Sequence, residues 1–316
     1  MSRVTNTRRR SGYTPRMSRL RFLVIAFGAV ACSDDGVGPA DGGVDLGEPD
    51  AGDPSAALFD PEQLIEIEIE MPDADWDELR VQTRSFFDIL TSDCLAEPFP
   101  SPFTYFSATV TVDGTQIEDV GVRKKGFLGS LDDIRPSLKI KFDEYVADQE
   151  FLGLTRLTLN NARQDPSFAR QCLAYGIFDE AGVPASRCNF ARVTVNGEEL
   201  GLYVNVESVD KKFLARHYDD ADGNLYEGTL SDFRDGWTGT FEKKTNEMDP
   251  DRSDLDLLVT AGEAADADLA DALEAQMDLD QFFMFWATEV MTSHWDGYAQ
   301  NNNNFFVYRD PTTERF

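Results

Sequence analysis

A strict alternation of apolar and acidic residues restricts the fold of this chain more than any other feature. From Leu64 to Glu70 the chain reads Leu-Ile-Glu-Ile-Glu-Ile-Glu. Successive side chains of a strand point to opposite faces, so one face here is apolar and the other is charged. The pattern predicts a sheet with one face against a core and the other in water. The remaining chain must therefore supply further strands and the core itself.

Turn residues between apolar runs predict those further strands. Asn196-Gly197 separates runs over 187–195 and 198–207, and Asn-Gly is the preferred pair for a tight hairpin turn. Asp113-Gly114 separates 104–112 from 115–126 in the same way. Further strands are expected at 64–70, 135–142, 156–159, 224–227, 239–244 and 305–308.

Helical spacing of apolar residues predicts helices at 73–88, 165–181, 210–217, 255–261, 266–276 and 279–292. The helix over 165–181 has start signals, with Asp165 as N-cap and Pro166 in the first helical position, and Gly182 ends it. A strand-rich front half with one long helix thus precedes a helical back half. This order predicts an α+β fold.

The first residues predict export. Residues 1–21 contain seven arginines and no acid, and 22–31 form an apolar run too short to span a bilayer as a helix. Ala29-Val30-Ala31-Cys32 resembles a bacterial lipobox; an ordinary signal peptide with a chance cysteine is the alternative. We expect a lipoprotein signal peptide over 1–31, a disordered Gly/Asp/Pro-rich tether over 32–57 and a folded domain over 58–316. The protein would be exported and lipid-anchored through Cys32 at the cell envelope, in the periplasm or on the cell surface.

The net charge restricts the partners. The whole chain has 29 basic and 58 acidic residues. Removing residues 1–31 takes away seven arginines and no acid, which leaves 22 basic residues and a net charge of −36. Such a charge argues against nucleic acid and against anionic lipid headgroups as partners. It favours cationic partners and divalent metals.

Three cysteines remain beside Cys32, and export implies an oxidising compartment where disulfides persist. Cys172 lies on an expected helix and Cys188 opens the next expected strand, so packing of these two elements predicts a Cys172–Cys188 disulfide. Cys94 is left free or paired elsewhere. Three cysteines without Cys-x-x-Cys spacing and two histidines argue against a zinc site.

One polar loop has the composition that phosphoryl transfer requires. It follows the apolar helical segment 282–290, which we expect to hold the loop against the core. The loop offers Asp296 and then four asparagines, among them Asn301 and Asn304. A carboxylate can orient the attacking hydroxyl, and an amide oxygen can bind the metal. His294-x-Asp296 with Asn301 matches the spacing of the kinase catalytic loop. The competing interpretation is a polar loop whose asparagines form turns and cap strands.

Two further groups could bind nucleotide. Lys139 and Lys141 share the face of the 135–142 strand opposite its apolar face, and such a pair could hold phosphates. Glu207, at the end of the Asn-Gly hairpin, could pair with one of these lysines or contact the nucleotide. The competing interpretations are a solvated strand face and a surface carboxylate.

Taken in order, these segments resemble the CotH family of spore-coat kinases over about residues 62–316. The resemblance is carried by the segments Gly121 to Gly126, Pro136 to Phe142, Leu159 to Asn161 with Asp165 to Ser167, Val193 to Gly197 with Gly201 to Tyr203, Glu207 to Asp210, Asn224 to Tyr226, His294 to Asp296 and Asn304 to Tyr308. No single segment is decisive, but the ordered set is specific.

The resemblance implies an atypical, two-lobed protein-kinase-like fold with a strand-rich N-terminal lobe and a helical C-terminal lobe. It implies ATP with Mg²⁺ or Mn²⁺ and transfer of the γ-phosphoryl group to Ser or Thr of a protein substrate. Asp296 matches the catalytic aspartate, Asn304 is the preferred metal ligand with Asn301 as the second choice, and Lys139 or Lys141 matches the basic strand position.

The sequence also departs from the family pattern. The family continues with a Pro-Trp-Asp-x-Asp-like segment whose Asp binds the metal, so we expect a kinase-like domain that is incomplete at its C-terminus. The alternative function is that of a non-catalytic pseudokinase or adhesin-like surface protein.

Overall fold

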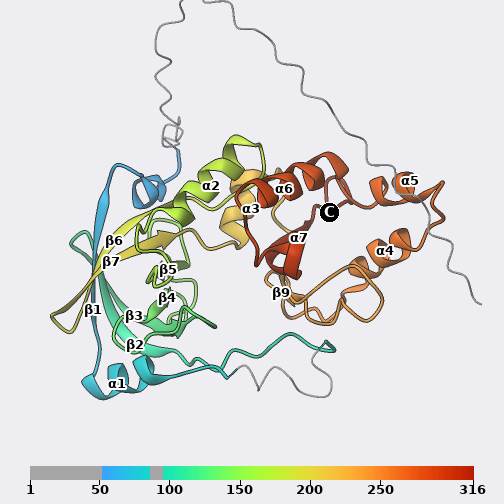
Figure 1. Ribbon diagram of the computed structural model, residues 1–316. Coiled ribbons are helices and arrows are strands. Elements are labelled where there is room, and N and C mark those ends of the chain that lie inside the picture. The colour runs from blue at the N-terminus through green and yellow to red at the C-terminus, as the bar shows by residue number, and fades with distance from the viewer. Residues whose placement is uncertain (1–51, 86–94) are drawn as a thin grey trace, which may run out of the picture. The chain divides into compact units, whose positions relative to one another are not determined.

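Two sheets and a set of helices make up the α+β fold, and this confirms the predicted class. The computed structural model describes residues 52–85 and 95–316 (Figure 1). Seven of the described strands form a closed, barrel-like sheet in the order β1–β2–β3–β4–β5–β7–β6, and three form a second sheet in the order β10–β8–β9. The strands are β1 (Leu64–Glu70), β2 (Phe106–Val112), β3 (Thr115–Lys125), β4 (Ser137–Lys141), β5 (Arg156–Asn160), β6 (Cys188–Val195), β7 (Glu198–Val206), β8 (Asn224–Thr229), β9 (Glu242–Lys243) and β10 (Asn303–Arg309).

The helices lie mainly in the second half of the chain. They are the 3-10 turn η1 (Ala56–Phe59), α1 (Asp73–Val81), α2 (Arg170–Glu180), α3 (Lys211–His217), α4 (Ser253–Gly262), α5 (Leu269–Glu274), α6 (Leu279–Met291) and α7 (Tyr298–Asn301). In the described part of the chain, none of these is both long and apolar enough to cross a membrane.

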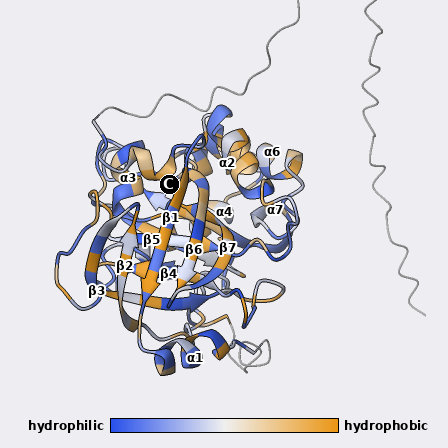
Figure 2. Ribbon diagram, turned by 90° about the vertical axis from the view of Figure 1, so that its left-hand side faces the viewer, coloured by the Kyte–Doolittle hydropathy of each residue, from blue (hydrophilic) through white to orange (hydrophobic). Residues whose placement is uncertain are grey.

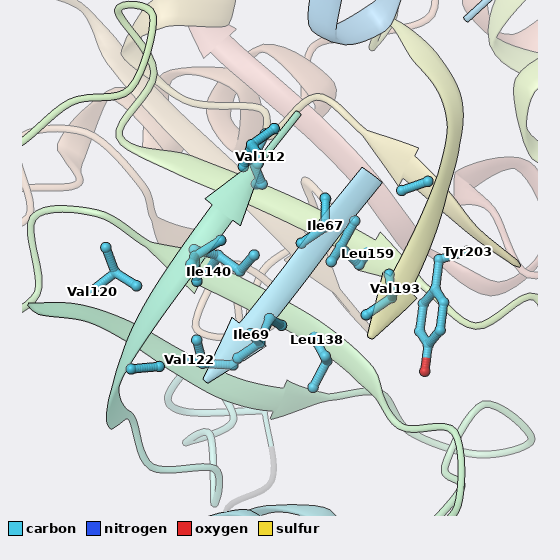
Figure 3. Close-up of a cluster of buried hydrophobic side chains, with 14 of the residues drawn as sticks. Ile67, Ile69, Val112, Val120, Val122, Leu138, Ile140, Leu159, Val193 and Tyr203 are labelled. Carbon is cyan, nitrogen blue, oxygen red and sulfur yellow. The ribbon is translucent and has the colours of Figure 1, made fainter. Parts of the chain in front are cut away.

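Parallel pairing of β1 with β6 closes the first sheet. Ile67 on β1 lies opposite Val193 on β6 and opposite Val112 on β2, and the other neighbouring strands pair antiparallel. The apolar side chains of all seven strands meet inside, where Ile67 and Val193 are fully buried (Figure 3). Burying a Val or Ile side chain contributes about 1.5–3 kcal/mol, so this interior is the main stabilising core.

The predicted alternation is confirmed by the burial along β1, β2 and β6. Along β1 the isoleucines are buried and the glutamates are exposed. On β4, Leu138 and Ile140 face the core, whereas Lys139 and Lys141 are only half-buried on the other face. Figure 2 shows hydrophobic and hydrophilic residues alternating along these strands. The closed sheet therefore places charged side chains on its outer surface.

Helix α2 begins five residues later than the sequence predicts. Asp165 does not cap the helix in the expected way; its carboxylate accepts from the backbone of Ser167 and of Arg170. Phe168 has a left-handed backbone with φ of +60°, which no α-helix accommodates. Residues 165–169 therefore form turns, and the helix starts at Arg170.

Other boundaries also differ from the predictions. Helix α1 ends at Val81, where Gln82 turns to an extended backbone, and β9 has only two residues. Helix α7 was not predicted. Residues 1–51, which include the predicted signal peptide, Cys32 and most of the tether, lie outside the described residues, as does Cys94. Ordered contacts begin before the predicted boundary at residue 58, because Asp53 and Ser55 bind the guanidinium group of Arg187.

Helix α6 is less buried than its composition predicts. Its buried residues are Thr288 and Glu289, whereas Phe283, Val290 and Met291 are more than half exposed. The helix contacts α2, where the rings of Phe178 and Phe285 lie 6.0 Å apart. Most large side chains of this apolar segment are therefore not buried, although the loop that it was expected to hold against the core does pack there through Tyr298.

The predicted Cys172–Cys188 disulfide is confirmed. It joins α2 to the first residue of β6 across a separation of 16 residues, with 5.2 Å between the two Cα atoms. The bond fixes α2 against the strand that closes the sheet.

Removing this disulfide is expected to lower the free energy of unfolding by about 3 kcal/mol, because a closed loop of this length restricts the unfolded chain by roughly that amount. The measurement is urea unfolding of the wild type and of the Cys172→Ser/Cys188→Ser double variant, each with and without reductant. Reductant should destabilise the wild type and leave the double variant unchanged. Equal stability of the oxidised wild type and the double variant would contradict the prediction.

Candidate functional site

The segment between α6 and β10 brings Asp296 and Asn304 together. The side-chain nitrogen of Asn304 donates to Oδ2 of Asp296 at 2.9 Å and to the backbone carbonyl of Asp296, also at 2.9 Å. Both bonds use the amide nitrogen, so they leave the amide oxygen of Asn304 unused. The two side chains that the sequence singles out as catalytic base and metal ligand are therefore direct neighbours.

Left-handed backbone at two asparagines produces this arrangement. Asn302, which ends α7, has φ of +51°, and Asn304 has φ of +52° at an irregularity in the pairing of β10 with β8. Asparagine enters this region more readily than other non-glycine residues. The turn-forming interpretation of the asparagines is thus correct for Asn302. Asn304 combines a turn backbone with a side chain that holds Asp296.

The other two asparagines differ in their contacts. Asn301 donates to the carbonyl of Trp295 at 2.6 Å and has no hydrogen bond to the carboxylate of Asp296. Asn303, which the sequence reading did not select, donates to Oδ1 of Asp296 at 3.3 Å. The amide oxygen of Asn303 is buried and has no hydrogen-bond partner. A buried acceptor without a partner is costly, so this oxygen is suited to bind a ligand.

Lys139 lies in a cluster of cations on the outside of the closed sheet. Arg123 lies directly opposite it on β3, and Lys125 is the next residue on the same face of that strand. Burial, and after it the nearby cations with Lys244 first among them, together lower the pKa of Lys139 to about 7. Burial likewise lowers the pKa of Lys125 to about 8, and its amine donates to Oδ1 of Asn160 at 2.8 Å. An anion would relieve this repulsion.

The second sheet supplies the balancing charges. Glu227 on β8 lies 3.0 Å from the amine of Lys244. Burial acts to raise the pKa of Glu227, but Lys244, Lys139 and Lys125 outweigh it and hold this pKa below its ordinary value. Glu227 is therefore ionised and lies within the field of lysines from both sheets. Lys125 could have been found from its period-2 position in 121–126, whereas no local pattern marks Glu227 or Lys244.

Lys141 has a different environment from Lys139, although both lie on the same face of β4. Its amine binds Glu144 at 2.8 Å and lies 4.0 Å from Asp143. Burial acts to lower its pKa, but these two acids outweigh it and raise the pKa of Lys141. Its charge is already neutralised locally.

Glu207 is engaged by arginines and not by the predicted lysines. Its carboxylate binds Arg187 at 2.8 Å and Arg216 at 2.5 Å, and it accepts from the backbone nitrogen of Arg187. The side chain is 3% exposed. The network joins the end of β7 to the start of β6 and to α3.

Strand β10 begins beside the Asp296–Asn304 pair and pairs with β8, whose Glu227 interacts with Lys139 and Lys125. In its pairing with β8, Phe306 lies opposite Glu227 and Phe305 lies opposite Gly228. Phe305 is buried, whereas Asn304 and Phe306 are exposed. Asn304 precedes Phe306 by two residues. The same short sheet therefore carries Asn304 near the start of β10 and Glu227 on the neighbouring strand β8, opposite Phe306.

A cavity of about 1110 Å³ lies between α2 and the α6–β10 segment. Aromatic side chains such as Phe168, Tyr175, Phe285 and Trp295 line it, and Asn304 is also in its lining. Lys125 and Lys139 are not among the lining residues. The cavity therefore borders the Asp296–Asn304 pair but is separate from the lysine cluster.

Residues 122–316 match the profile of the family described as CotH kinase protein. This range is more than half of the chain, so the chain belongs to the CotH family, as the sequence predicts.

Individual relatives agree with this assignment. The chain is 28% identical over 177 residues to inner spore coat protein H of Bacillus subtilis (strain 168), which covers 52% of this chain and 48% of the relative. It is 39% identical over 61 residues to an inner spore coat protein H-like protein of the same organism, covering 19% and 20%. It is 25% identical over 170 residues to Invasin CotH2 of Rhizopus delemar, covering 49% and 29%. The chain thus spans less than half the length of these relatives.

Lys139 should react with amine reagents at neutral pH far faster than Lys141. Acylating reagents attack the neutral amine, and a pKa of about 7 leaves roughly half of Lys139 neutral at pH 7, against about one in a thousand for an ordinary lysine. Mass spectrometry after limited acetylation measures both rates. Between pH 6 and pH 8 the Lys139 rate should rise about tenfold and then level off. A Lys139 rate that keeps rising to pH 10, in parallel with that of Lys141, would contradict the lowered pKa.

Proposed function

We propose that this chain is an exported atypical protein kinase that transfers the γ-phosphoryl group of ATP to Ser or Thr of a protein substrate, with Mg²⁺ or Mn²⁺. The observation that carries the proposal is the hydrogen bond from Asn304, at the start of β10, to Asp296; β10 pairs with β8, whose Glu227 interacts with Lys139 and Lys125. A carboxylate with an adjacent amide, and cations that can bind phosphate, are groups that phosphoryl transfer uses.

The order of the elements supports a two-lobed, kinase-like arrangement. The closed sheet of the front half would be the N-terminal lobe and would offer the lysines, as the strand lysine does in kinases. The sheet and helices after residue 210 would be the C-terminal lobe and would offer the loop with Asp296. The nucleotide would lie where Glu227 interacts with Lys139.

The phosphates of the nucleotide would bind the amines of Lys139 and Lys125. In the described residues neither lysine has an ion pair within 4.0 Å, whereas Lys141 is bound by two acids. Phosphate charge would raise the pKa of Lys139 back towards its ordinary value and stabilise the charged amine. Lys139 is therefore a better candidate than Lys141. Glu207 would act indirectly, by holding β7 to α3.

The oxygen donors around Asp296 fit a hard divalent cation. They are the carboxylate of Asp296, the unpartnered amide oxygen of Asn303 and the unused amide oxygen of Asn304. Mg²⁺ and Mn²⁺ prefer such oxygens, and when bound they supply positive charge to the phosphate oxygens. The described residues hold no group of three or more His, Cys, Asp or Glu at metal-binding distance, and Asp296 supplies the carboxylate of this donor set.

Asp296 would orient the hydroxyl of the acceptor Ser or Thr and accept its proton at a carboxylate oxygen. Asn303 and Asn304 would hold the carboxylate through their amide nitrogens. Asn301 would act on the loop through the carbonyl of Trp295.

The site of action would be outside the cytoplasm. The signal-like residues 1–31, the cysteine at position 32 and the acidic tether favour a lipid-anchored protein at the cell envelope. Relatives named for the spore coat and as invasins support a surface or extracellular location.

The second candidate is a non-catalytic surface protein that binds partners with the same fold. The names of the invasin relatives favour it. The two candidates differ in whether ATP is consumed.

Replacing Asp296 by Asn should reduce phosphate incorporation at least 100-fold, because loss of a general base costs about 10²–10⁴ in rate. The measurement is transfer from γ-³²P-ATP to a serine-rich protein mixture with Mn²⁺ or Mg²⁺. Asp235→Asn, an exposed loop variant with the same charge change, should retain wild-type transfer. Undiminished label in Asp296→Asn would contradict the role of Asp296. No label with the wild type would favour the binding protein.

Replacing Lys139 by Met should weaken ATP binding about tenfold or more, whereas Lys141→Met should change it less than threefold. The reason is that Lys141 is bound by Glu144, whereas Lys139 has no acid partner among the described residues. Isothermal titration with ATP in the presence of Mn²⁺ measures both affinities. Binding to the wild type should also weaken as the pH rises from 6 to 8.5, because the amine of Lys139 loses its proton above about 7. Equal losses in the two variants would contradict the assignment of Lys139 to the phosphates.

A further inference from the structure

A buried glutamate lies beneath the loop that carries Asp296. Glu289, near the end of α6, is 1% exposed. Its Oε1 accepts from the backbone nitrogen of Tyr298 at 3.1 Å and lies 3.1 Å from Nδ1 of His294. Its Oε2 accepts from the backbone nitrogen of Ala299 at 2.8 Å. Its backbone carbonyl accepts from the nitrogen of His294 at 2.9 Å.

These contacts hold the chain on both sides of Asp296. His294 lies two residues before it, and Tyr298 and Ala299 lie two and three residues after it. Helix α7 has no side-chain cap of its own, because Gly297 is its N-cap residue. The carboxylate of Glu289 takes over that role from a different helix and satisfies two of the free N–H groups at the start of α7.

Gly297 shows how closely the loop is fitted to Glu289. A Cβ at this position would lie 2.2 Å from Oε1 of Glu289 and 2.5 Å from Nδ1 of His294. Any other residue would therefore displace the carboxylate or the loop. The position requires glycine because of this contact, since its φ of −94° is accessible to every residue.

We propose that Glu289 is a positioning residue for Asp296, which fixes the carboxylate against Asn303 and Asn304. This inference rests on the proposed function of Asp296. A buried carboxylate must be hydrogen-bonded, and here all its contacts go to the loop of Asp296. A displacement of about 1 Å of a catalytic group can cost roughly 100-fold in rate, so loosening this clamp should act on catalysis.

The test is Glu289→Gln, with Thr288→Val as the matched control. Gln keeps the size of the side chain but turns one acceptor into a donor facing a backbone N–H. Thr288 is also buried in α6, but its hydroxyl donates within the helix to the carbonyl of Met284. Glu289→Gln should lower kcat by roughly ten- to 100-fold and leave KM for ATP within about twofold. Amide hydrogen exchange at Tyr298 and Ala299 should accelerate in this variant alone.

Two outcomes of the kinetic test would overturn the proposal. One is an unchanged kcat in Glu289→Gln. The other is an equal loss of kcat in Thr288→Val, which would indicate general loosening of α6.

If the wild type transfers no phosphate, the proposed function fails, and the affinity for Mn²⁺ then tests whether Glu289 positions the loop of Asp296. Calorimetry should then show that Glu289→Gln binds Mn²⁺ at least threefold more weakly than the wild type. Loss of a residue that holds a metal ligand in place weakens metal binding by about 10–100-fold in many sites. Equal affinity, or no Mn²⁺ binding by the wild type, would overturn the proposal.

Discussion

The pairing of β1 with β6 is the constraint on which the rest of the structure depends. These two strands would otherwise be open edges, and their parallel register joins them so that seven strands enclose one core. Once closed, each strand commits one face to the interior and the other to the outside. That division leaves Leu138 and Ile140 inside and puts Lys139 on the outer surface, where it meets charges from the second sheet.

Much of the front half of the fold could be predicted from the sequence, because period-2 alternation and turn residues are local signals. Asn196 and Gly197 both have positive φ, as the predicted tight turn requires. The start of α2 could not be predicted in the same way. Its cap signals at Asp165 are satisfied by a turn, and no residue propensity indicates the left-handed backbone of Phe168, whose ring lies 5.6 Å from the guanidinium of Arg135.

The candidate site was predictable only where its parts are close in the sequence. Asp296 and Asn304 are eight residues apart, so one loop accounts for their contact. The environment of Lys139 depends on Glu227 of β8 and on Lys244, just after β9, which follow it by about ninety and one hundred residues. For the same reason Lys139 and Lys141 looked equivalent on their strand, although local acids bind only one of them.

The Cys172–Cys188 bond has a topological consequence for the integrity of the molecule. Residues 172–188 form a covalent ring that contains most of α2, the turn after it and the approach to β6. A protease that cuts the backbone within this ring opens the loop but releases no fragment, since the sulfur bridge still connects the two pieces. A nicked chain would therefore remain one covalent body under oxidising conditions and would separate only after the bridge is reduced.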